Sequence, residues 1–86
     1  MGKVPRPKPA RLPEKLRQIR LALNLSQNGM LRDLGLAESS YRSAVSGWEL
    51  GTREVPLPIL LTYARLAGVS TDNLIDDEAD LPKKFQ

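Results

Sequence analysis

The chain has 86 residues, of which 27% are charged, and a net charge of +3. That length suffices for one small domain, which buries only roughly 60% of the surface of its unfolded chain. The chain has no cysteine, so disulfides and thiolate metal sites are excluded. It also has no histidine, so the commonest general base and metal ligand is missing. We therefore expect no enzymatic activity, no metal and no cofactor.

The longest apolar run, residues 55–61, contains two prolines and is too short to span a bilayer. The N-terminal segment carries positive charge but no apolar stretch follows it, which disfavours a signal peptide. A cytoplasmic protein with no membrane segment is expected.

Charge is distributed unevenly along the chain. Residues 1–32 contain eight lysines and arginines against Glu14 alone, whereas residues 71–81 contain five acidic side chains and no cation. The basic end suits a polyanion and the acidic end is repelled by one, although a basic run is often just a solvated face. Proline alternates with positive charge near the start, which predicts an extended arm. We divide the chain into a basic proline-rich arm (1–12), a helical domain (13–76) and an acidic C-terminal tail (77–86).

Two helices are predicted in the first half of the domain. Leucine and isoleucine recur at spacings of four, three and four from Leu12 to Leu23, which predicts an amphipathic helix that begins at Pro13. Asn24 is suited to the left-handed conformation that often ends a helix. Ser26 is a good N-cap for the second helix, and Gly35 is predicted to end it.

Three more helices are predicted after a turn at residues 36–40. The third runs from about Ser40 to Leu50, with Val45 and Trp48 pointing inward, and ends at Gly51. The fourth begins at Pro56 or Pro58 and ends at Gly68, and its predicted buried stripe is Leu60, Leu61, Ala64 and Ala67.

The fifth helix is short, with Thr71 as its predicted cap and Ile75 near its end. The acidic chain after Asp76 is expected to fray, although Leu81 and Phe85 are able to dock on an apolar surface. Because no segment alternates with period two, the fold class is all-α with five short helices.

At this point the residues resemble the Cro/Xre family of lambda-repressor-like helix-turn-helix proteins, from about residue 12 to residue 75. The resemblance rests on motifs that occur in the family's order: Ile19-Arg20, Leu25-Ser26-Gln27, Leu34-Gly35, Ser46-Gly47-Trp48-Glu49-Leu50-Gly51, Pro56, Leu60 to Ala64, Gly68-Val69 and Leu74-Ile75. It implies a five-helix lambda-repressor-like DNA-binding domain.

Three departures from the family pattern are visible. The chain is about four residues longer between Gly35 and Trp48, which implies an expanded turn between helices 2 and 3. The start of the recognition helix is therefore open among Ser39, Ser40, Tyr41 and Arg42. Bulky Leu31 stands where the family has a small alanine, and Gly47 replaces a long polar residue that commonly reaches DNA.

The resemblance also implies which residues bind DNA. Phosphate contacts fall on Gln27, with Asn28 beside it, and on Thr52 and Arg53 in the loop after helix 3. The early positions of helix 3, which reach base edges in the family, fall on Arg42, Ser43 and Gly47, with Ser46 alongside and Tyr41 before them. Arginine pairs with guanine through two hydrogen bonds, but Arg42 is equally able to hold a phosphate or to be solvated. Tyr41 either stacks in the groove or covers the lengthened turn.

Other residues have a structural reading. Trp48 belongs to the core, and the resemblance implies an ion pair between Arg20 and Glu49. The cations Lys3, Arg6, Lys8 and Arg11 of the arm lie along phosphates or in the minor groove, or are simply solvated.

The sequence thus predicts a sequence-specific regulator of transcription, a repressor, that binds double-stranded DNA as a homodimer. The dimer contact is expected on helix 5 and the tail through Phe85. The alternative is an antitoxin-type interaction protein, whose acidic tail neutralises a basic toxin or other protein partner.

Overall fold

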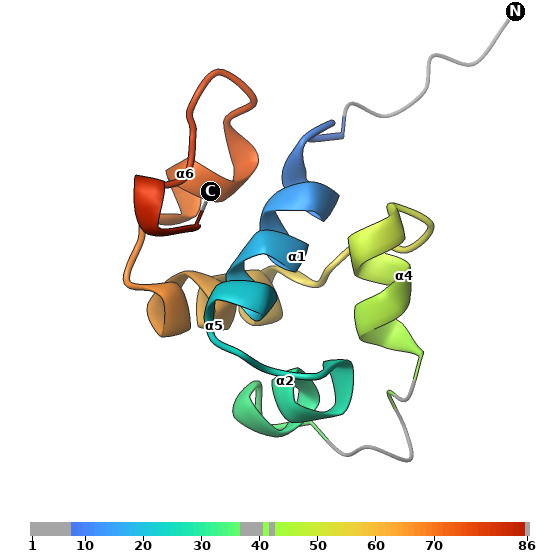
Figure 1. Ribbon diagram of the computed structural model, residues 1–86. Helices are drawn as coiled ribbons and strands as arrows, with labels where there is room; N and C mark the ends of the chain where they lie inside the picture. The colour runs from blue at the N-terminus through green and yellow to red at the C-terminus, as the bar shows by residue number, and fades with distance from the viewer. Residues whose placement is uncertain (1–7, 37–40, 42, 86) are drawn as a thin grey trace, which may run out of the picture.

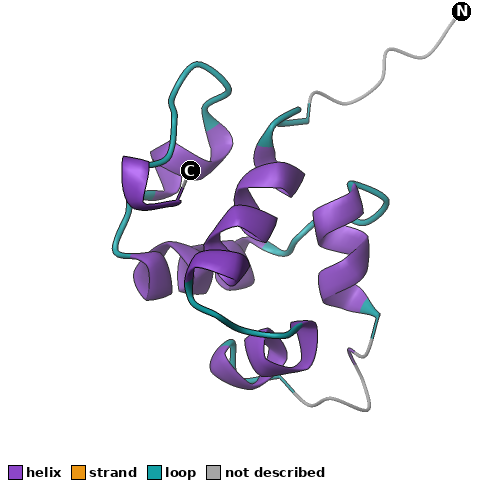
Figure 2. Ribbon diagram, in the orientation of Figure 1, coloured by secondary structure: helices purple, strands orange, loops and turns teal. Residues whose placement is uncertain are grey.

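The computed structural model describes residues 8–36, 41 and 43–85. Within those residues the secondary structure consists of helices joined by loops, with no strand (Figure 2), so the predicted all-α class is confirmed. The elements are α1 (Leu12–Ala22), α2 (Gln27–Asp33), α4 (Ala44–Leu50), α5 (Leu57–Ala67), α6 (Thr71–Ile75) and a short 3₁₀ helix, η1 (Lys83–Phe85). In this described part, no helix has the length and apolar character needed to cross a membrane.

Helix α1 is the central element of the fold (Figure 1). It packs against α4 on one side and against α6 and η1 on the other, and it also contacts α5. Helix α2 packs on α4, so the second and third of the predicted helices lie next to each other. This arrangement leaves the side of α4 that faces away from α1 at the surface of the molecule (Figure 1).

A single apolar core joins these helices. Its buried members are Leu16, Ile19, Met30, Leu31, Leu34, Ala44, Val45, Trp48, Leu60, Tyr63, Ala64, Ala67, Leu74, Leu81 and Phe85. The indole of Trp48 meets the ring of Tyr63 edge to face, with the centroids 6.4 Å apart, a favourable arrangement of two aromatic quadrupoles. Val45 and Trp48 therefore point inward as predicted, and the bulky Leu31 is fully accommodated in the core.

The helix ends follow the predicted local chemistry. The Ser26 hydroxyl accepts a hydrogen bond of 2.9 Å from the backbone N–H of Gly29, and so satisfies one of the free donors of α2. Asn24 adopts a left-handed conformation with φ of 58°, and Gly51 ends α4 with φ of 78°. These three predictions are confirmed.

Two local predictions are wrong. Helix α6 is capped by Ser70 instead of Thr71, because the Ser70 side chain accepts from the backbone of Asn73 while the Asn73 side chain accepts from the backbone of Ser70. In α5, Leu61 is 41% exposed and Tyr63 takes its place in the core. The buried positions 60, 63, 64 and 67 follow the helical period, which places residue 61 on the outer face.

The predicted fraying after Asp76 is also wrong for the described residues up to Phe85. Leu81 and Phe85 are buried in the core, Phe85 with 7% of its surface exposed. The carboxylate of Asp77 accepts the backbone N–H groups of Ala10 and Arg11 at 2.9 and 3.0 Å. The acidic segment therefore folds back onto the start of α1.

A buried lysine holds the same segment. Lys15 is 2% exposed, and its ammonium donates to the carbonyl oxygens of Asn73, Asp76 and Ala79 at 2.7, 2.9 and 2.7 Å. All three donors of the ammonium are thus satisfied, which compensates for the cost of burying its charge. Local sequence patterns give no sign of this pairing between Lys15 and the acidic segment, so the sequence predicted a frayed tail.

Candidate DNA-binding site

The first part of the site is the start of α2. Gln27 is the first residue of the helix and is half-buried, and Asn28 beside it is exposed. The Ser26 cap fixes the direction of this first turn because it ties the Gly29 amide back to the preceding residue. The side-chain amides of Gln27 and Asn28 carry N–H donors of the kind that contact phosphate oxygens.

The second part is the outer face of α4. Because Ala44, Val45 and Trp48 are buried, the helix turns Ser43 and Ser46 to its other sides, where Ser43 is exposed and Ser46 half-buried. Tyr41 is 38% exposed, so the ring does not enter the core. Arg42, for which we predicted a DNA contact, lies outside the described residues, as do Ser39 and Ser40.

A bidentate ion pair fixes α4 relative to α1. The Arg20 guanidinium donates to both carboxylate oxygens of Glu49, at 2.7 and 3.0 Å, and also to the carbonyl of Leu25 at 2.9 Å. The side chains are only 12% and 4% exposed, so the pair has little contact with water. The hydrogen bond to Glu49 raises the pKa of Arg20 above its usual value. The implied Arg20–Glu49 pair is present, and it joins α1, α4 and the loop that leads into α2.

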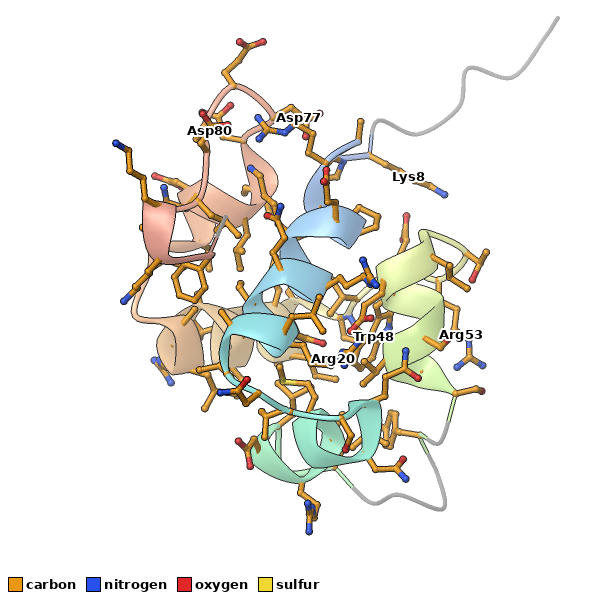
Figure 3. The ribbon with its side chains drawn as sticks, in the orientation of Figure 1. Lys8, Arg20, Trp48, Arg53, Asp77 and Asp80 are labelled. Atoms are coloured by element: carbon orange, nitrogen blue, oxygen red, sulfur yellow. The ribbon has the colours of Figure 1, made fainter. Side chains whose placement is uncertain are left out.

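The third part is the loop after α4. The backbone N–H groups of Thr52 and Arg53 donate to the Gly47 carbonyl at 3.0 and 3.2 Å, so the loop folds back over the last turn of the helix. Both Thr52 and Arg53 are exposed. Arg53 lies on the side of α4 away from α1, whereas Trp48 lies between the two helices (Figure 3).

Of the four cations in the predicted arm, Arg11 is bound within the protein and Lys8 is exposed. Arg11 is engaged by the acidic segment, because its guanidinium donates to the carbonyl of Asp77 at 2.7 Å and pairs with the carboxylate of Asp80 at 2.6 Å. It is therefore not presented to a phosphate. Lys8 is exposed (Figure 3), while Lys3 and Arg6 lie outside the described residues.

The structure also corrects the expected dimer contact. Phe85 packs into the core of its own chain, so it is not a surface residue that a second copy is able to cover. The acidic tail of the antitoxin alternative is likewise occupied, since Asp77 and Asp80 bind residues of the same chain. Asp76 and Glu78 in the same segment remain exposed.

One feature of the site was missed in the sequence, namely the position of the Arg53 side chain over Gly47. A Cβ atom at Gly47 would lie 2.6 Å from Cδ of Arg53. The available signal was a glycine inside a helix, at a position where a long polar residue was expected, followed six residues later by an arginine.

Comparisons with known proteins agree with this geometry. The uncharacterised HTH-type transcriptional regulator YobD of Bacillus subtilis is 36% identical over 62 residues, which are 72% of this chain and 52% of that protein. The chain therefore spans about half the length of this curated relative. No family model matches the chain.

Two solved structures share the fold. The restriction-modification controller protein C.AhdI of Aeromonas hydrophila is 33% identical, with a TM-score of 0.61 over 74% of this chain and 91% of that one. The P22 c2 repressor, in a complex with a synthetic operator, has a TM-score of 0.64 and 24% identity over 77% of this chain and 94% of that one.

The fold and the paired helices α2 and α4 define a helix-turn-helix protein. The chain belongs to the Cro/C1-type, lambda-repressor-like family of helix-turn-helix proteins.

Proposed function

We propose that the protein is a sequence-specific regulator of transcription, a repressor, that binds double-stranded DNA and acts by occupying an operator. The observation that carries this proposal is the exposed outer face of α4, which packs next to α2 and is fixed to α1 by the buried Arg20–Glu49 pair. A rigid, exposed helix of this kind fits the major groove, and a regulator of this kind needs no catalytic group.

The roles of the residues follow from their positions. Gln27, Asn28 and the loop at Thr52 contact phosphates and so fix the register of α4 on the duplex. Ser43, Ser46 and Tyr41 face the groove from α4 and the segment before it. Arg42, which precedes α4 in the sequence, pairs with a base edge.

The contacts supply affinity and specificity separately. Neutralising phosphates with lysine and arginine releases counterions, which gives binding that weakens with salt but does not depend on sequence. Base contacts add about 1–3 kcal/mol of discrimination each. A domain of 86 residues makes few such contacts, so a symmetric dimer on a palindromic site is part of the proposal.

Selection of bound sequences from a random duplex pool tests the function. We expect an enriched palindrome whose half-sites are about one helical turn, 10–10.5 base pairs, apart. A pool that shows no enrichment after repeated rounds, from protein that is folded, contradicts the proposal.

Arg42→Ala tests the recognition helix itself. The variant is expected to lose affinity for the selected site while its thermal midpoint stays near that of the wild type. Arg65→Ala is the matched control, because Arg65 is an exposed arginine on α5, outside the proposed site. A large fall in the midpoint for Arg42→Ala would instead make that residue structural.

A further inference from the structure

The close approach of Arg53 to Gly47 is unusual for a helix interior. A Cβ atom built on Gly47 would lie 2.6 Å from Cδ, 2.8 Å from Cγ and 3.2 Å from Cβ of Arg53. A Cβ atom essentially never lies within 3.0 Å of a non-bonded heavy atom, so any other residue at position 47 would displace Arg53. The aliphatic stem of Arg53 therefore lies in the space that a side chain at position 47 would fill.

Backbone geometry holds Arg53 in this place. The Gly47 carbonyl accepts the N–H groups of Thr52 and Arg53, and the Thr52 hydroxyl donates to it at 3.4 Å. Gly51 makes the sharp return possible through its left-handed conformation. Arg53 is thus held by a hydrogen bond to the carbonyl of Gly47, the residue that its own side chain covers.

The direction of the side chain follows from its surroundings. Gly47 is buried although it has no side chain and lies one turn after the exposed Ser43, because Arg53 covers it. Arg53 as a whole stays exposed, so its stem packs on α4 while its charged end reaches solvent, as arginine stems commonly do. Figure 3 shows it on the side of α4 away from Trp48 and α1.

We infer that Arg53 supplies the groove-facing side chain that Gly47 lacks, and that its guanidinium reads a guanine at the edge of the site. The inference rests on the proposed DNA-binding function and assigns one of its specificity residues. The planar guanidinium matches the N7 and O6 acceptors of guanine with two hydrogen bonds. Packing of three stem carbons on the helix restricts the rotamers of Arg53, so less entropy is lost when it binds.

A phosphate contact is the competing role for Arg53, and charge-conserving substitution separates the two. Lysine keeps the positive charge, so Arg53→Lys retains a phosphate contact but loses the bidentate pairing with guanine. The measurement is the affinity of wild type, Arg53→Lys and Arg53→Ala for the selected operator and for all its single-base variants. Arg65→Lys, on the exposed side of α5, serves as the control and keeps the wild-type preferences.

For both Arg53 variants we expect discrimination at one G·C pair in each half-site to fall by about 5- to 150-fold, with the other positions unchanged. If Arg53→Lys keeps every base preference of the wild type, Arg53 is a phosphate contact and the inference is wrong. If the wild type itself shows no base preference, the proposed function fails instead, so the two failures are distinguishable.

Gly47→Ala gives an independent test of the contact. Alanine is favoured over glycine inside a helix, so this variant is expected to fold. Its Cβ displaces Arg53, and discrimination at the same G·C pair is expected to fall as in Arg53→Lys. In the Arg53→Ala background, Gly47→Ala is expected to change nothing further. An equal loss in both backgrounds would show that position 47 acts without Arg53.

Discussion

Glu49→Gln is expected to destabilise the whole domain. The Glu49 side chain is 4% exposed and binds Arg20 through both oxygens, and the Arg20 side chain is 12% exposed. Glutamine keeps the shape of the side chain but removes its charge, so the Arg20 guanidinium stays buried without a counterion. Removing one partner of a buried ion pair costs about 3–5 kcal/mol.

This loss is large compared with the stability of a small domain. At roughly 0.05–0.15 kcal/mol per residue, a chain of 86 residues is stable by about 4–13 kcal/mol. In a domain of this size each kcal/mol lowers the thermal midpoint by about 4–8 °C, so Glu49→Gln should lower it by about 12–40 °C. A loss of DNA binding by this variant would therefore report unfolding instead of a lost contact.

Circular dichroism melts of three variants test this reasoning. The double variant Arg20→Met with Glu49→Leu removes both charges and should recover most of the stability lost in Glu49→Gln. Glu78→Gln, at an exposed glutamate, is the matched control and should stay within about 0.5 kcal/mol of wild type. A midpoint for Glu49→Gln within about 3 °C of wild type, less than 1 kcal/mol, would refute the reasoning.

Three further outcomes are expected. Lys15→Met removes a donor from three carbonyl oxygens, of which that of Asp76 still accepts the N–H of Ala79, and should cost about 2–4 kcal/mol in urea unfolding. Lys83→Met, at an exposed lysine, should cost almost nothing, and equal midpoints for the two variants would contradict the role of Lys15. The N–H groups of Arg11 and Ala10 lower the pKa of Asp77 below its usual 3.8, so this carboxylate stabilises the fold above about pH 4 and the contribution is lost as pH falls through the lowered pKa. Asp77→Asn should therefore show a flatter loss of stability below pH 4, and an acid unfolding curve that keeps the wild-type slope would disprove this. Deleting residues 1–9 should reduce the dependence of DNA affinity on salt if the arm binds phosphates, and an unchanged slope would assign that segment to a linker.

The helices and most of their ends were predictable because their signals are local. Ser26 caps α2 through a hydroxyl that reaches an amide only three residues away, and Asn24 adopts the left-handed conformation that few other residues tolerate. In α5 the sequence analysis placed Leu61 in the buried stripe and omitted Tyr63. The helical period counted from Leu60 favours position 63, which is the buried one.

The pairing of the two ends of the domain was not predictable in the same way. Lys15 reads as a solvated lysine in an amphipathic helix, and its burial depends on carbonyl groups that lie about sixty residues later in the chain. A single sequence contains no local sign of such a contact, so the acidic segment was expected to fray.

The candidate site was predictable to the extent that it depends on helix ends. The positions of Gln27 and Thr52 follow from where α2 begins and α4 ends. The contact between Arg53 and Gly47 was not predictable from the sequence. It depends on the path of the loop after Gly51, and that path is set by hydrogen bonds to the Gly47 carbonyl in α4.

The docked acidic segment has a consequence for how the protein would meet DNA. Asp77 and Asp80 lie near α6 and the start of α1, away from Arg53 and the loop after α4 (Figure 3), and Arg11 binds both of them. The negative charge of these two carboxylates is therefore kept away from the proposed DNA-binding face. In the field of a duplex, their repulsion would favour encounters in which that face points toward the DNA. Arg11, which holds these aspartates in place, would thus influence the rate of encounter.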